Sequence, residues 1–208
     1  TRAVEEFVHA GYDIDAEAIL LCESDGTPEE VAEEIERMTQ VLNQCGAIRI
    51  QVSQSEAERL KFWSGRKNAF PAAGRISPDY YCMDGTIPRQ HIATLLKRIQ
   101  DMEKKYQLRC MNVFHAGDGN LHPLLLFDKR VPGIMDRVHR AGERIVKASI
   151  AAGGVLSGEH GIGLEKQDFM PLMFEPADLA AQAAMRRAFD PTGLANPFKV
   201  LPSPAACG

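Results

Sequence analysis

The chain has 208 residues, of which 45% are apolar and 25% are charged, and its formal net charge is −4. These proportions are typical of a folded globular protein and exclude a disordered or fibrous chain. The acidic balance argues against nucleic acid as a partner, because Lys and Arg supply most of the affinity for phosphate backbones.

Helical and strand-like segments alternate through the first two thirds of the chain. A first helix is expected around Val4 and Phe7. The next should begin at Thr27, which can act as the cap, with Pro28 at the first helical position and Glu30 three residues after the cap. Further helices are predicted at residues 56–63 and 88–102. Short apolar runs between turn residues predict strands at residues 18–22, 47–52, 79–83, 110–114 and 121–127.

The remaining third of the chain is predicted to be mainly helical. One long helix is expected at residues 134–152, a glycine-rich loop at 157–163, and two more helical stretches at 165–174 and 176–189. We therefore expect an α+β fold, as a single domain over residues 1–208. It should have a mainly antiparallel sheet, helices packed on one face in a ferredoxin-like arrangement, and a helical C-terminal part.

The five cysteines are odd in number, scattered and without a Cys-x-x-Cys pair. This pattern argues against a disulfide framework and against a zinc finger. We expect small buried side chains or free thiols in a reducing cytoplasm at Cys22, Cys45, Cys82, Cys110 and Cys207.

Two histidines flank a turn signal in the segment from His115 to His122. Asp118-Gly119 between two apolar runs predicts a two-residue hairpin turn, which would pair His115 directly with His122. Side chains paired in this way point to one face with Cβ atoms about 4.5–5.5 Å apart, close enough to share a metal ion. A slip of one residue would separate them onto opposite faces, and the histidines would then be ordinary polar strand residues.

A second segment with possible chemistry is the glycine-rich loop, which contains Glu159 and His160. Two histidines and one carboxylate are a common ligand set for Zn, Mn or Fe. Spacing alone does not bring this loop to the hairpin, and a plain connecting loop with a solvated Glu159 is the alternative. Arg66 could bind a carboxylate or simply stabilise the end of its helix.

Three motifs occur in a fixed order: the segment from His115 to His122, the loop at 157–163, and Phe189-Asp190-Pro191-Thr192-Gly193 followed by Asn196-Pro197. Together they resemble the C-terminal domain of FAD-linked oxidases of the vanillyl-alcohol oxidase type. Residues 65–71 and 79–89 look most like the glycolate oxidase members of that family. The resemblance covers nearly the whole chain.

The resemblance implies a site for a 2-hydroxy acid. His115, His122 and Glu159 would hold a divalent metal, Zn, Mn or Fe, that binds the 2-hydroxyl and carboxylate oxygens of the substrate. His160 would be the general base, and hydride would pass from C2 to the flavin N5. Arg66 would grip the substrate carboxylate.

Two departures from the family pattern bear on this reading. Asn196 matches an asparagine near the flavin ring, but Phe198 stands where the family usually has glycine. Some relatives carry a lysine where this chain has Cys82 and Met83, which favours a small monocarboxylate such as glycolate over a dicarboxylate. The resemblance to glycolate oxidase makes the oxidation of glycolate to glyoxylate the expected reaction. The sequence does not distinguish glycolate from D-lactate, which differs from it by one methyl group.

The family's FAD-binding domain lies N-terminal to this one and is absent from the chain, which begins at Thr1. The isolated chain should therefore be inactive. The resemblance also implies other oxidase subunits and a cytoplasmic location, with attachment to the inner face of the membrane through those subunits. No apolar run reaches the roughly 18 residues of a membrane span.

Two alternatives stay open. One is a non-catalytic metal-binding or subunit-interaction module of the same fold, and the other is a hydrolase that uses the same metal ligands with bound water.

Overall fold

A computed structural model describes residues 1–202, so Cys207 lies outside the described part of the chain. The chain divides into two compact units, residues 1–72 and 73–208, and each is described by itself. Over the described residues, no helix is both long enough and apolar enough to cross a membrane.

The first unit is helical. It contains α1 (Arg2–Val8), α2 (Pro28–Gln44), α3 (Glu56–Lys67) and the start of α4 (Ala69–Ile76), which was not predicted. The predicted start of α2 is confirmed, because the Glu30 amide donates to the Thr27 hydroxyl and the Thr27 amide donates to the Glu30 carboxylate. The Gly65 amide of α3 donates to the Tyr12 hydroxyl at 2.9 Å, which ties the segment after α1 to α3.

The strand predictions at residues 18–22 and 47–52 are wrong, because both segments have irregular backbone. A strand needs a neighbour for its backbone hydrogen bonds, and the first unit offers only helices and loops over its described residues. The apolar side chains of these segments consequently remain exposed; examples are Leu20 and Ile48. The apolar composition of these segments therefore predicted strands, but no neighbouring strand is present among the described residues of the first unit to pair with them.

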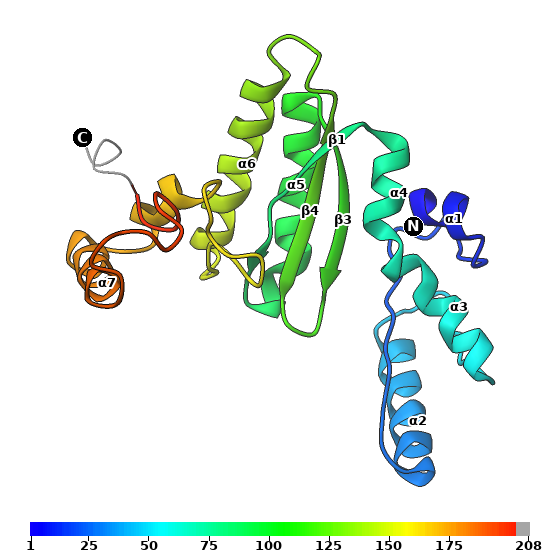
Figure 1. Ribbon diagram of the computed structural model, residues 1–208. Coiled ribbons are helices and arrows are strands. Elements are labelled where there is room, and N and C mark those ends of the chain that lie inside the picture. The colour runs from blue at the N-terminus through cyan, green and yellow to red at the C-terminus, as the bar shows by residue number, and fades with distance from the viewer. Residues whose placement is uncertain (203–208) are drawn as a thin grey trace. The chain divides into compact units, whose positions relative to one another are not determined.

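The second unit contains an antiparallel sheet built around one central strand. That strand is β4 (Asn120–Phe127), which pairs with β3 (Arg109–His115) along one side. Along the other side it pairs first with β2 (Gly85–Thr86) and then with β1 (Asp79–Cys82), so these two short strands share one edge. The three strands predicted in this part of the sequence are all present (Figure 1).

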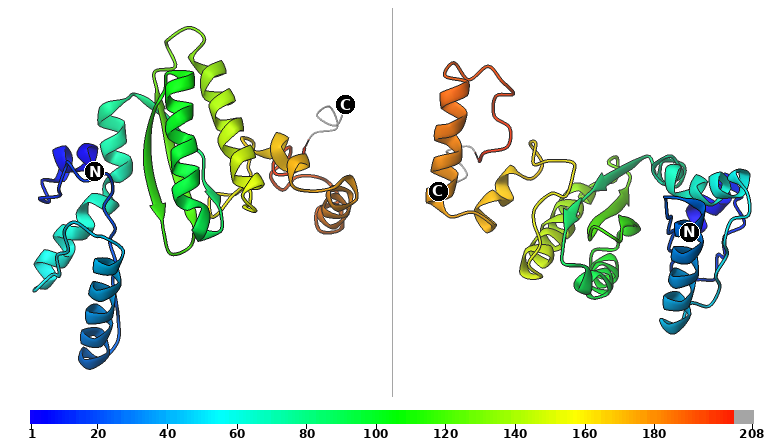
Figure 2. Two further views of the ribbon diagram at one scale, coloured as in Figure 1. Left: turned by 180° about the vertical axis from the view of Figure 1, so that it is seen from behind. Right: turned by 90° about the horizontal axis from the view of Figure 1, so that it is seen from below.

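Two long helices cover one face of this sheet, as Figures 1 and 2 show. They are α5 (Ile92–Tyr106), which follows the short 3-10 helix η1 (Arg89–His91), and α6 (Ile134–Ala151). Their buried side chains form the core with alternate residues of β4, namely Leu95, Ile99, Val138, Ile145, Leu121 and Leu125. The alternation of a strand then places Asn120, His122 and Leu124 on the opposite face.

The C-terminal part is helical, as predicted. It contains η2 (Gln167–Leu172) and α7 (Pro176–Phe189), and α7 has the predicted bounds. The first stretch is a 3-10 helix with Pro171 inside it, where a proline removes a backbone donor and disfavours an α-helix. The predicted class, an α+β fold with helices on one face of an antiparallel sheet, is confirmed.

Candidate metal centre

The two histidines of the hairpin share a face, but their predicted pairing is wrong. His115 pairs with Asn120, and His122 pairs with Val113, so the register differs from the prediction by two residues. The turn is a four-residue loop over 116–119 rather than a two-residue turn. A two-residue turn of that type needs positive φ at both central residues, and only Gly119 has it, at 71°.

Although the predicted register is wrong, the prediction that the two histidines share a face still holds. Because side chains alternate with a period of two, a shift by two residues returns each one to the same face. His115 and His122 are therefore diagonal neighbours on the face of the sheet opposite α5 and α6. The centroids of their rings lie 5.6 Å apart, with the rings nearly perpendicular.

Glu159 from the glycine-rich loop meets both histidines. Its Oε1 lies 2.8 Å from Nε2 of His122 and 3.8 Å from Nε2 of His115. One potential ligand atom from each of the three residues lies within 4.8 Å of the other two. The structure thus brings together the three residues for which the sequence predicted a metal-binding role.

The three side chains differ in exposure. That of His122 is only 2% exposed, whereas those of His115 and Glu159 are 42% and 49% exposed. Burial, followed by the nearby His160, lowers the pKa of His122, although the Glu159 carboxylate opposes this effect. A lowered pKa keeps the imidazole neutral near pH 7, and the neutral form is the one that can bind a metal.

His160 lies beside the cluster. Its ring stacks on that of His122, with a centroid distance of 4.9 Å and an angle of 12° between the rings. Its Nε2 is 3.7 Å from Oε1 of Glu159, and the side chain is about two-fifths exposed. A partly exposed imidazole next to the three potential ligands can accept a proton from a molecule bound there.

Asp84 and Lys166, which the sequence reasoning did not single out, support the loop that carries Glu159. Asp84 lies in the link between β1 and β2 and accepts hydrogen bonds from loop amides and from the Lys166 ammonium. Burial by itself raises the pKa of Asp84, but hydrogen bonds from the Glu159 amide and from Lys166 outweigh it and hold the pKa below its usual range. No sequence motif marks these two residues, because they are 82 positions apart.

Arg66 and Asn196 are the two other residues for which the sequence predicted a role in the site. Arg66 lies on α3 in the first unit. Asn196 lies in the exposed loop after α7, has a positive φ of 48°, and contacts Lys199 through its side chain. Their roles toward substrate carboxylate and flavin stay predictions.

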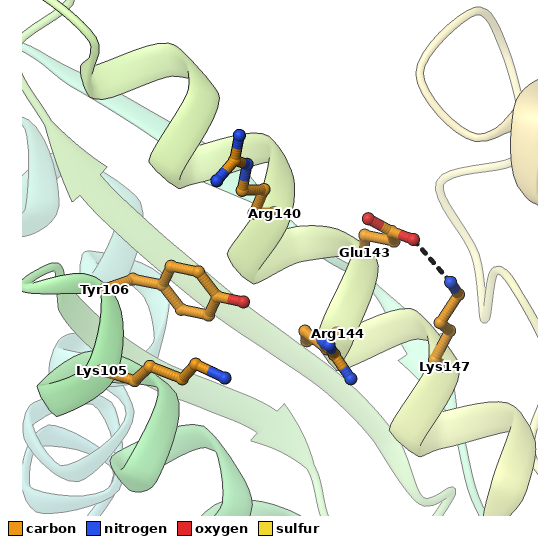
Figure 3. Close-up of a pocket in the computed structure, with 6 residues that line it drawn as sticks. All are labelled: Lys105, Tyr106, Arg140, Glu143, Arg144 and Lys147. Carbon is orange, nitrogen blue, oxygen red and sulfur yellow. Dashed lines mark hydrogen bonds and ion pairs between the residues drawn. The ribbon is translucent and has the colours of Figure 1, made fainter.

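The helix side of the sheet carries a separate hollow of about 490 Å³, shown in Figure 3. It lies between α5 and α6 and has no residue in common with the cluster. Its lining consists of Lys105, Tyr106, Arg140, Glu143, Arg144 and Lys147. The candidate centre is instead a partly exposed group on the opposite face of the sheet.

Comparison with known proteins identifies the class. The family described as FAD linked oxidases, C-terminal domain, matches residues 1–200, and the chain belongs to this family. The relatives include the glycolate oxidase subunit GlcD of Escherichia coli strain K12, which is 52% identical over 99% of this chain. GlcD of Bacillus subtilis is 34% identical over 95% of the chain, and a D-lactate dehydrogenase of Anaerostipes hadrus is 31% identical over 88%.

The chain spans only about two-fifths of the length of these relatives, namely 41%, 42% and 39%. The predicted resemblance to FAD-linked oxidases, and to glycolate oxidase in particular, is confirmed.

Proposed function

We propose that this chain is the substrate-binding and metal-binding part of an FAD-dependent 2-hydroxy-acid oxidoreductase. Residues 1–208 would act as one domain of a longer protein whose FAD-binding domain is N-terminal. The observation that carries the proposal is the meeting of His115, His122 and Glu159, whose potential ligand atoms lie within 4.8 Å of one another. The relatives named glycolate oxidase and D-lactate dehydrogenase support the substrate class.

The donor set fits a divalent metal. Two imidazole nitrogens and one carboxylate oxygen suit Zn, Mn or Fe and leave further coordination positions for substrate or water. The exposure of His115 and Glu159 leaves room for a small ligand on one side of the cluster. When bound, the metal would act as a Lewis acid toward the 2-hydroxyl and carboxylate oxygens of the substrate.

Three residues of the chain would accept the proton, bind the substrate carboxylate and lie near the flavin, respectively. His160 would accept the proton of the 2-hydroxyl on a ring nitrogen, because it lies beside the ligands and is partly exposed. Arg66 would bind the substrate carboxylate through its guanidinium fork. Asn196 would lie near the flavin ring, and FAD would supply the acceptor for the hydride that leaves C2.

The residues near the cluster favour a small monocarboxylate over a dicarboxylate as the substrate. Cys82 pairs with Leu124 of β4, and therefore points to the same face as His122. Burial raises the pKa of Cys82 to about 12, so its thiol is neutral at pH 7. A cysteine side chain carries no positive charge at any pH, so Cys82 offers no partner for a second carboxylate. This favours a monocarboxylate, and the relatives named glycolate oxidase favour glycolate, with glyoxylate as the product.

The complete protein would work with other oxidase subunits in the cytoplasm, and those subunits would provide any attachment to the inner face of the membrane. The chain itself offers no membrane-crossing helix over its described residues.

The proposal is tested with the longer protein that contains this chain, purified with its flavin. Under anaerobic conditions, glycolate should bleach the flavin absorption, and a His160→Gln variant should bleach it at least about 100-fold more slowly because it lacks the base. D-lactate and D-2-hydroxyglutarate serve as competing substrates. A protein that binds metal but whose flavin is reduced by none of the three would instead be a non-catalytic binding module.

A further inference from the structure

One carboxylate organises the backbone of the loop that carries Glu159. Oδ2 of Asp84 accepts the amides of three successive residues, Gly158 and Glu159 at 2.9 Å each and His160 at 3.0 Å. The hydroxyl of Ser157 donates to the same carboxylate at 3.1 Å. Three consecutive amides that converge on one oxygen form an anion-binding nest, and its anion here is a side chain of the same protein.

Lys166 balances the charge of that carboxylate. The side chains of Asp84 and Lys166 are 0% and 3% exposed, respectively, and they form a direct ion pair. The Lys166 ammonium also donates to the Asp84 carbonyl oxygen at 2.7 Å. Because the two charges are opposite, the pair is neutral as a unit. Because each charged group also has hydrogen-bonding partners, the pair can remain in the interior.

The sheet restricts the loop from the other side. A Cβ added at Gly158 would lie 2.2 Å from Oδ1 of Asn120 and 2.5 Å from Oγ1 of Thr86, which are paired residues of β4 and β2. The backbone at this point is therefore packed directly against the strands. The loop is held between Asp84 and the sheet, although it has no regular secondary structure.

The side chain of Glu159 has few contacts that could fix its position. It is about half exposed, and its carboxylate contacts only the three histidines among the described residues. The direction in which it leaves the backbone therefore depends on its amide, which Asp84 holds. A metal ligand needs this kind of support, since outer residues that orient ligands affect metal affinity by about 10–100-fold.

We propose that Asp84 and Lys166 are a positioning pair that holds the Glu159 backbone in the place where its carboxylate meets His115 and His122. This inference deepens the proposed function and rests on its metal site. It assigns to the pair a role that a purely stabilising ion pair would not have.

The test compares Asp84→Asn with a matched control, Asp79→Asn, in the 208-residue chain. Asp79 is also an aspartate that accepts a backbone amide and pairs with a lysine, Lys129, but none of its described contacts involves the loop. Co²⁺ serves as the probe, and its visible absorption reports both affinity and ligand geometry. Asp84→Asn should weaken Co²⁺ binding at least about tenfold and change the spectrum, whereas Asp79→Asn should leave both unchanged.

A double variant, Asp84→Asn with Lys166→Met, keeps the test decisive if the single variant does not fold. It removes both charges at once, so the net charge near the metal stays the same and no lone charge is buried. The neutral asparagine oxygen accepts these loop donors more weakly than the carboxylate, because hydrogen bonds to an ionised acceptor are stronger. Weakened Co²⁺ binding in the folded double variant would support positioning, and binding equal to that of the unchanged chain would overturn it.

Hydrogen exchange at the amides of residues 158–160, measured without metal, separates this inference from the proposed function. If the unchanged chain binds no Co²⁺, the proposed metal site fails. The hold of Asp84 on the loop is then judged by exchange alone, which should speed up at least about tenfold in the Asp84 variants. Unchanged exchange would overturn the positioning role whether or not Co²⁺ binds.

Discussion

His115 and His122 reach the same carboxylate from neighbouring strands, but their surroundings differ. His122 is buried, stacks on His160 and lies 2.8 Å from Glu159, whereas the side chain of His115 is 42% exposed. Both residues could bind the metal, but only His122 should contribute substantially to the stability of the folded chain.

This difference predicts separate effects on stability in the absence of metal. His122→Ala should destabilise the chain by about 1–3 kcal/mol, because it leaves a cavity and removes a ring contact in a buried place. His115→Ala should change the free energy of unfolding by no more than about 0.5 kcal/mol, as exposed substitutions do. Urea unfolding with a chelator present measures both, and equal losses for the two variants would contradict the assigned environments.

At the same scale, the sequence predicted the ligand residues but not the residues that support them. Histidines and a glutamate are recognisable because their side chains carry the expected chemistry. Asp84 and Lys166 come together only through the fold, between the β1–β2 link and a segment far along the chain. Nothing in the sequence around Asp84 or Lys166 indicates that the two side chains form an ion pair.

At the scale of elements, the hairpin shows what an alternating pattern can and cannot determine. The apolar runs around His115 and His122 predicted both strands, and the period of two predicted the shared face. The register depended on the turn, and the four-residue loop could not be distinguished from an Asp-Gly turn by composition. The strands predicted at 18–22 and 47–52 failed for a different reason, since pairing partners are a tertiary property.

The hairpin loop yields a prediction that contrasts two of its glycines. At Gly119, a Cβ would lie 2.1 Å from the Ile87 carbonyl oxygen, and φ is 71°. At Gly117 there is open space and no positive φ. Gly119→Ala should therefore destabilise the chain by about 1–3 kcal/mol, while Gly117→Ala should be close to neutral.

Thermal or urea unfolding of the two glycine variants decides this point. Because both positions lie in the same loop, a general sensitivity of the loop would affect both equally. Equal stability of the two variants would mean that Gly119 has no special backbone role and that the loop differs from the four-residue form.

At the scale of the whole molecule, the described cysteines of the two units differ in exposure. Cys22 and Cys45 of the first unit are exposed, whereas Cys82 and Cys110 of the second are partly buried. Burial raises the pKa of Cys82 to about 12 and raises that of Cys110 as well. No disulfide joins the described cysteines, which agrees with the predicted free thiols.

Alkylation of the native chain should follow this division. The thiolate is the reactive form, and a raised pKa lowers the thiolate fraction at any given pH. Near pH 8, Cys22 and Cys45 should react with iodoacetamide at least about tenfold faster than Cys82 and Cys110, as measured by peptide mass spectrometry. Comparable rates at all four positions in the folded chain would contradict the burial of the second pair.

The predicted fold class and family hold for the molecule as a whole, and the potential metal ligands all lie in its second unit. The parts of the proposed reaction that reach beyond this unit involve Arg66 and the FAD-binding domain. The sequence suggests both of them by resemblance to the family. Metal binding by His115, His122 and Glu159 is therefore the part of the proposal that can be tested with this chain alone.

Elemental analysis of the purified chain after incubation with divalent ions tests that claim most directly. The chain should hold about one equivalent of Zn, Mn or Fe. His115→Ala and Glu159→Ala should each lose the metal. His91→Ala, which changes a histidine of η1 that does not belong to the cluster, should retain it. No bound metal in the unchanged chain, or metal retained in both ligand variants, would contradict a metal centre formed by the hairpin and the glycine-rich loop.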